Sequence, residues 1–212
     1  MKKKSILTLP LLILTLLFYA ASVQAATPKY VSLYRSLLKK KTIPVQSTTS
    51  GYTYNYEMKS FRTLDVNRDG IPELFVKNTE PNKTFSTVRI YSVKNKKLFF
   101  CGEYGTKSET TIKYYKKYKG ILNTWWTNGV GGTGAVMYGV SLKKDELPVR
   151  YWAWQGMSSS SPNAVKVYKI GKKQTITTEA KFNAYVDKYF NLDNYRTYKF
   201  IRNNATNRGK IK

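Results

Sequence analysis

Oxygen-bearing side chains recur at every second position in the segment Asp-Val-Asn-Arg-Asp-Gly-Ile-Pro-Glu-Leu, which begins at residue 65. Asp65, Asn67 and Asp69 take its first, third and fifth positions, and a glycine at the sixth position permits the sharp bend of a loop that wraps around one ion. Hard cations such as Ca²⁺ take about six to eight oxygen ligands in such loops. We therefore predict a calcium site built from Asp65, Asn67, Asp69, the backbone carbonyl of Ile71, and Glu73.

The loop differs from that of a helix-loop-helix EF-hand. An EF-hand loop has a bidentate Glu at its twelfth position and helices on both sides. Here the twelfth position is Val76, and residues 71–76 have the apolar, β-branched character of a strand. The alternative is a metal-free turn, because Asn, Asp and Gly dominate turns for their own reasons. The further oxygen at Glu73 favours the metal, since turn chemistry does not require it.

The same loop carries a resemblance to known proteins. Together with the following Val-Arg-Ile-Tyr-Ser-Val strand at residues 88–93 and the helices expected at both ends, it resembles small secreted proteins of low-GC bacteria. The loop itself is similar to that of FG-GAP and VCBS repeats in integrin-type β-propellers. This resemblance implies a metal-binding role for Asp65, Asn67, Asp69 and Glu73, although Arg68 stands where the motif often has glycine. A single loop does not imply a complete propeller.

The N-terminus has the pattern of a secretory signal. Lysines at positions 2–4 precede an apolar run and then the small residues up to Ala25, so residues 1–25 are predicted to be removed on export. No stable membrane anchor is expected after cleavage. Loss of these three lysines lowers the formal net charge from +25 to +22. Such a charge favours anionic polymers or glycans of the cell surface as partners.

The composition restricts the possible catalytic chemistry. The chain contains no His, which excludes a Ser-His-Asp triad and a Cys-His pair. A calcium-dependent secreted hydrolase, either a nuclease or a glycosidase, is the alternative to a binding protein, with carboxylates drawn from Glu57, Glu103, Glu109, Asp145 and Glu146. A third possibility is a cationic protein that acts directly on foreign cell envelopes.

Two sets of residues are candidates for ligand binding. The first interleaves cations with tyrosine rings and contains Lys113, Lys116, Lys117 and Lys119. The second is the pair Trp152 and Trp154, which share one face of a predicted strand. Each set has a structural alternative, namely a half-buried strand with solvated lysines for the first and core packing for the second.

The predicted fold is a single α+β domain over residues 26–196, with one twisted or curled antiparallel sheet between N-terminal and C-terminal amphipathic helices. The helices are indicated by apolar residues at helical spacing after Pro28 and after Thr177 or Thr178. Residues 197–212 are expected to form a basic, frayed tail. Cys101 lies in an apolar strand and is predicted to be a small buried hydrophobe. The expected strands are 61–64, 71–77, 87–93, 97–102, 111–118, 121–127, 135–142, 149–154 and 164–170.

Overall fold

The computed structural model describes residues 27–46, 53–79, 85–107, 111–127, 132–158 and 164–212. Its helices are α2 (Lys29–Lys39), α3 (Glu179–Phe190) and α4 (Ala205–Gly209), with 3₁₀ turns η1 (Lys116–Tyr118) and η2 (Leu192–Asn194). Its strands are β1 (Thr42–Gln46), β2 (Thr53–Glu57), β3 (Ser60–Leu64), β4 (Glu73–Thr79), β5 (Phe85–Lys94), β6 (Lys97–Lys107), β7 (Thr111–Tyr115), β8 (Gly120–Thr127), β9 (Gly132–Tyr138), β10 (Val149–Met157), β11 (Lys166–Ile170), β12 (Thr175–Thr177), β13 (Arg196–Lys199) and β14 (Ile201–Arg202).

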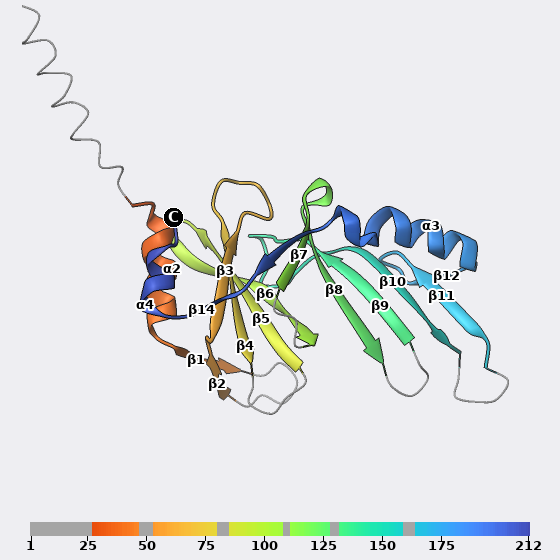
Figure 1. Cartoon of the computed structure of the whole chain (residues 1–212), viewed down its shortest axis with the longest axis horizontal. Coiled ribbons are helices and arrows are strands. Elements are labelled where there is room, and N and C mark those ends of the chain that lie inside the picture. The colour runs from red at the N-terminus through yellow and green to blue at the C-terminus, as the bar shows by residue number, and fades with distance from the viewer. Residues whose placement is uncertain (1–26, 47–52, 80–84, 108–110, 128–131, 159–163) are drawn as a thin grey trace, which may run out of the picture.

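The described strands form more than one sheet, so the expectation of a single sheet is wrong. A five-stranded sheet has the order β14-β3-β4-β5-β6, a seven-stranded sheet has the order β12-β11-β10-β9-β8-β7-β13, and β1 and β2 form a separate hairpin. All pairings are antiparallel. The division occurs at β7, because its free edge pairs with β13 from the C-terminal segment and not with β6. The two large sheets lie side by side along the longest axis of the molecule (Figure 1).

Helix α2 packs against the five-stranded sheet, as its apolar stripe predicts. It follows Pro28 directly, without a side-chain cap, and buries Val31, Tyr34, Leu37 and Leu38. These side chains join a cluster that also contains residues of the β1–β2 hairpin and of β3 and β4.

Helix α3 covers one face of the seven-stranded sheet (Figure 1). The Thr178 hydroxyl accepts a hydrogen bond from the Lys181 backbone amide at 3.4 Å, which confirms the predicted N-cap. Phe182 and Phe190 are buried against this sheet, together with partly buried tyrosines such as Tyr151 and Tyr189, whose rings stack at 3.9 Å between centroids.

A third apolar cluster joins the two large sheets. It combines β4–β6 residues of the five-stranded sheet with Ile112, Tyr114 and Ile121 of the seven-stranded sheet. Cys101 belongs to this cluster and is a free, buried thiol, which confirms its predicted role. The Asn123 side-chain amide adds a polar link between the sheets by donating to the Gly105 carbonyl at 2.9 Å.

The C-terminal segment is ordered, in contrast to the expected frayed tail. Strand β13 pairs with β7 and β14 pairs with β3, so the chain crosses from one large sheet to the other (Figure 1). Helix α4 then reaches α2, where the Arg35 guanidinium donates to the carbonyls of Arg208, Gly209 and Ile211. Backbone pairing and these bonds outweigh the polar composition from which fraying was inferred.

The predicted signal segment, residues 1–25, lies outside the described residues. In the part of the chain that is described, no helix has the length and apolar character needed to span a membrane.

Candidate metal centre

The β3–β4 hairpin positions the predicted calcium loop. Its ladder closes with Leu64 opposite Glu73, so Asp65 leaves one strand just as Glu73 begins the other. Arg68 and Gly70 have positive φ angles of 61° and 87°, which turn the loop back on itself. Nothing lies within 4 Å of a side-chain carbon built at Gly70, so glycine is required there by the backbone conformation and not by close packing.

The hairpin brings Asp65, Asp69 and Glu73 together. Each offers one carboxylate oxygen, and these oxygens lie within 4.8 Å of one another. Glu73 is 0% exposed. Its Oε1 atom and the Oδ1 atom of Asp65 are buried without a hydrogen-bond partner. Buried oxygens without partners are costly, and a cation held between them would satisfy both.

Three of the other four carboxylate oxygens are held by backbone amides of the loop. Val66 N–H donates to Glu73 Oε2 at 2.8 Å, Gly70 N–H to Asp65 Oδ2 at 3.2 Å, and Ile71 N–H to Asp69 Oδ1 at 2.8 Å. These bonds hold the carboxylates in place without an ion. The loop therefore presents a preorganised set of hard oxygen ligands.

The predicted ligands Asn67 and Ile71 also lie at this loop, where both contact Asp69. The Asn67 side chain accepts from the Asp69 amide and donates to Asp69 Oδ2, each at 2.9 Å. Ile71 contributes its amide to Asp69, while its carbonyl is the atom predicted to bind calcium. The carboxylate cluster thus contains three of the five predicted residues, with the other two bonded to one member of the cluster.

The charge state of Glu73 reflects its burial. Desolvation raises the pKa of Glu73 from 4.5 to about 8, the Val66 amide opposes this rise, and repulsion from Asp69 and Asp65 adds to it. A bound divalent cation would reverse the effect by favouring the charged carboxylate.

Neighbouring elements bond to the loop's backbone carbonyls. Tyr34 of α2 donates to the Pro72 carbonyl at 2.7 Å, and Tyr114 of β7 donates to the Val66 carbonyl at 3.2 Å. Lys119 Nζ, which follows η1, donates to the Asn67 carbonyl at 2.8 Å. The loop consequently contacts α2 and both large sheets. Sequence reasoning missed these tyrosines, since nothing in the local sequence indicates which distant carbonyl a hydroxyl reaches.

The four predicted ligand-binding lysines have different environments. Lys113 is half-buried in β7, Lys116 is exposed, and the ammonium of Lys117 lies 5.5 Å from the centroid of the partly buried Tyr118 ring. Lys119 bonds to the predicted metal loop and so anchors it. In return, Arg68 Nη2 donates to the Lys116 carbonyl at 2.9 Å.

A pocket of about 440 Å³ lies beside the metal loop. Arg68, Lys116 and Arg196 contribute cations to it from the loop, η1 and β13, and Tyr114 and Tyr198 line its walls with Leu64 and Asp65. The sequence did not predict this pocket, because Arg196 follows Asp65 by more than a hundred residues and is brought to it by the pairing of β13 with β7.

The predicted tryptophans line a different pocket, of about 290 Å³, together with Lys169 and Gln174. Trp152 and Trp154 are partly buried, so neither is a fully buried core residue. Trp154 lies opposite Lys169 on β11, and Lys169 lies opposite Ile176 on β12, so the three form a row across the sheet. The neighbouring Ala153 belongs to the cluster under α3. Because successive residues of a strand point to opposite faces, this row faces away from α3. Ile176 at the end of the row is 69% exposed.

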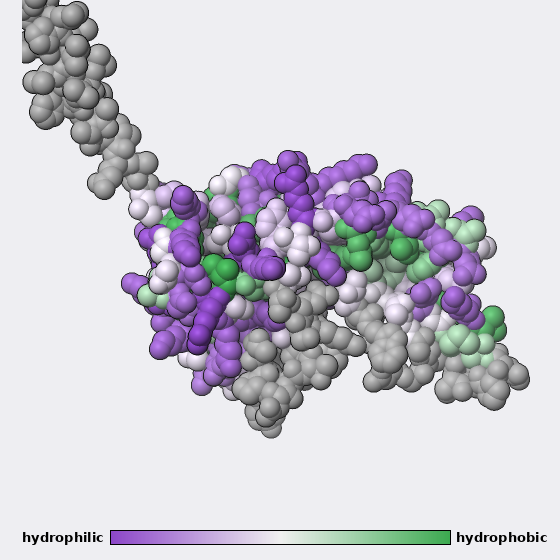
Figure 2. Space-filling model, in the orientation of Figure 1, coloured by the Kyte–Doolittle hydropathy of each residue, from purple (hydrophilic) through white to green (hydrophobic). Residues whose placement is uncertain are grey.

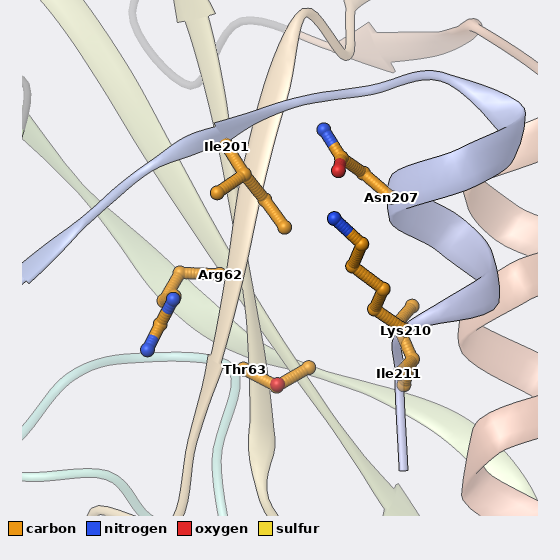
Figure 3. A pocket seen from close by; sticks show the side chains of 6 residues that line it. All are labelled: Arg62, Thr63, Ile201, Asn207, Lys210 and Ile211. Atoms are coloured by element: carbon orange, nitrogen blue, oxygen red, sulfur yellow. The ribbon is translucent and has the colours of Figure 1, made fainter.

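A third pocket, of about 280 Å³, lies between β3 and the C-terminal segment. In Figure 3 the Asn207 and Lys210 side chains extend from the α4 region toward Ile201 of β14, and Arg62 and Thr63 come from β3. The Arg62 guanidinium also lies 5.6 Å from the centroid of Tyr198, a wall residue of the pocket beside the metal loop.

The carboxylates considered for hydrolysis are dispersed. Glu103 pairs with Arg89, Glu57 with Lys59 and Glu146 with Lys144, while Asp145 is exposed and Glu109 lies outside the described residues. Each of the three paired carboxylates already has a cationic partner, and none belongs to the metal cluster.

Comparisons of this chain with protein-family models, with curated proteins and with solved structures find no match.

Proposed function

We propose that this is a secreted, cationic calcium-binding protein that acts as a non-enzymatic binding module for anionic polymers at the cell surface. The observation that carries the calcium assignment is the buried carboxylate of Glu73, whose Oε1 has no partner and which lies beside Asp65 and Asp69. An acidic turn without a metal gives no reason to bury such a group.

The proposed role of the ion is structural. All of its proposed ligands come from one tight hairpin, and water would complete the coordination shell. The loop that holds it is bonded to Tyr34 of α2 and to Tyr114 and Lys119 of the seven-stranded sheet. Calcium would therefore stabilise the junction of these elements. Such a structural role does not require an open coordination position for a substrate.

The surface beside the loop supports an anionic partner. Figure 2 shows hydrophilic side chains over most of the visible face. The formal charge of +25 lies far from neutrality, and Lys116, Lys117, Arg68 and Arg196 add cations close to the metal loop. Such a surface attracts polyanions over distances of about 10 Å at moderate salt.

Glycan binding at the tryptophans is the second candidate. The pocket of Trp152, Trp154, Lys169 and Gln174 combines two indole rings with hydrogen-bonding groups, a combination suited to sugar rings. Gly132 permits this arrangement, because a side-chain carbon there would lie 2.6 Å from the Trp154 indole nitrogen.

The calcium assignment is tested by melting the protein in about 1 mM calcium and in excess chelator. For a dissociation constant near 10⁻⁴ M, the tight end of the range for extracellular modules, calcium adds about 1.4 kcal/mol to the free energy of unfolding. The melting temperature should fall on chelation, and Asp69→Ala should remove the difference. An Asp145→Ala variant, which also removes one carboxylate, should retain it. Identical wild-type melting curves would contradict calcium binding.

The partner class is tested by a binding screen of anionic polymers and neutral glycans at several salt concentrations. Polymer binding should weaken linearly on a log-log scale as salt rises, with a slope near 0.7–0.9 per phosphate contact on nucleic acid. Replacing Lys113, Lys116, Lys117 and Lys119 by Gln should flatten that slope. Salt-independent binding that is lost in Trp152→Ala would instead favour the glycan candidate.

A further inference from the structure

The pocket beside the metal loop is strongly cationic. Arg68, Lys116 and Arg196 converge on it from three separate elements. Its one carboxylate, Asp65, already accepts from the Gly70 amide and belongs to the metal cluster. Among the described residues, none of the three cations forms a salt bridge. An incoming anion would supply the missing countercharge, and two guanidinium groups favour phosphate, which they can bind with paired hydrogen bonds.

The aromatic walls of the pocket do not offer a stacking platform. Tyr114 is 4% exposed and donates its hydroxyl to the Val66 carbonyl. Its ring lies 6.4 Å from that of Tyr198, over which the Arg62 guanidinium lies. Single-stranded nucleic acid relies on exposed rings for base stacking. This pocket therefore favours a polymer that presents phosphate without bases, such as a polyol phosphate.

The pocket is connected to the metal loop through Arg68. This residue lies between the predicted ligands Asn67 and Asp69, has a φ angle of 61°, and donates to the Lys116 carbonyl at 2.9 Å. Lys119 ties the same turn to the Asn67 carbonyl. An ion that fixes the loop would thus fix the backbone positions of two of the three cations.

We propose that this pocket binds a phosphate group of a polyol-phosphate polymer and that calcium in the adjoining loop strengthens this binding. The inference rests on the proposed calcium-binding function. Because coupling between two binding sites is reciprocal, phosphate should strengthen calcium binding by the same factor.

The test measures binding of glycerol 3-phosphate and of a glycerol-phosphate oligomer to the purified protein by calorimetry. We expect Arg196→Gln to weaken binding about tenfold or more, because it removes a charge-assisted hydrogen bond. Arg202→Gln is the matched control, because this substitution removes the same charge. Arg202 is exposed on β14 and does not line the pocket. Its affinity should stay within about twofold of wild type, as one distant charge contributes little in moderate salt. Lys116→Gln gives an independent check. It removes a second cation of the pocket but keeps the backbone carbonyl that accepts from Arg68.

Equal losses in Arg196→Gln and Arg202→Gln would reject a specific pocket in favour of diffuse attraction. Tighter binding of a single-stranded oligonucleotide than of a glycerol-phosphate oligomer of equal charge would reject the polyol assignment. Equal affinity in calcium and in chelator would reject the coupling. A calcium-dependent melting temperature without phosphate binding would remove this proposal alone, whereas a calcium-independent melting temperature would remove the proposed function on which it rests.

Discussion

The buried carboxyl of Glu73 links the stability of the metal loop to pH. Burial raises its pKa to about 8 in the folded protein without calcium, compared with 4.5 for an ordinary carboxyl. The folded state therefore holds this proton more tightly than the unfolded chain does. The resulting stabilisation is fully present below about pH 4.5 and is lost as pH rises through about 8.

We expect the free energy of unfolding in chelator to fall between pH 5 and pH 8.5 and calcium to offset much of that fall. Glu73→Gln should flatten the pH dependence in chelator and raise stability at pH 8.5, while abolishing stabilisation by calcium. Urea titrations across this pH range measure both effects. Glu57→Gln, which removes an exposed carboxylate paired with Lys59, is the control and should retain the wild-type slope. A Glu73→Gln slope equal to that of wild type would show that Glu73 does not titrate as inferred.

At the scale of elements, the Arg35 side chain connects the first described helix to the last one. Arg35 of α2 donates three hydrogen bonds, two to carbonyls of the last residues of α4 and one to the Ile211 carbonyl just after it. Helix α4 spans only Ala205–Gly209, so it is too short to be stable by itself in water. Docking on α2 therefore supplies much of its stability.

Arg35→Met should destabilise the protein by about 1–3 kcal/mol, because it removes three bonds from a charged guanidinium, two of them to the carbonyls of Gly209 and Ile211. Hydrogen exchange should accelerate mainly in residues 203–211. Lys29→Met changes an exposed cation of the same helix and should leave this exchange unchanged. Protection of residues 203–211 in Arg35→Met that equals wild type would contradict the anchoring role.

At the scale of the whole molecule, the proposed calcium loop lies where the two large sheets meet. Arg68 and Lys116 form one polar link between loop and seven-stranded sheet, and Lys119 and Asn67 form another. The apolar cluster around Tyr114 and Ile121 joins the same sheets beneath these links. Loss of a bound ion should therefore affect the segment around Lys116 and Lys119, on the side of the seven-stranded sheet, as well as the loop.

Chelation should accelerate hydrogen exchange in residues 115–120 as well as in residues 65–73, while α3, which packs on β10 and β11, serves as an internal reference. Lys119→Gln should reproduce the change at residues 115–120 in the presence of calcium. Lys117→Gln should not, since its ammonium lies over the Tyr118 ring and does not bond to the loop. A calcium effect confined to residues 65–73 would show that the junction does not depend on the ion.

Local sequence patterns were sufficient for several elements. The apolar stripes around Leu37 and Phe182 identified α2 and α3, and the hydroxyl at Thr178 marked where α3 begins. Most strands of the two large sheets were also predicted. In contrast, β1, β2, β12, β13, β14 and α4 were missed. Strands β13 and β14 and helix α4 are held by partners distant in sequence. Strands β1 and β2 pair with each other but bury only Val45 and Tyr56, and β12 spans only three residues, so none of them has a clear apolar pattern.

The sequence by itself determined that Asp65, Asn67, Asp69 and Glu73 lie at one loop, since residues so close along the chain cannot separate within a short hairpin. It also determined the charge available to an anionic partner. Only the tertiary structure decided that Glu73 is buried, that Lys119 anchors the loop, and that Arg196 reaches the pocket beside it. These facts depend on the pairing of β13 with β7 and on the packing of two sheets. Burial and long-range pairing are properties of the assembled chain, because no residue's local sequence specifies which distant surface will cover it.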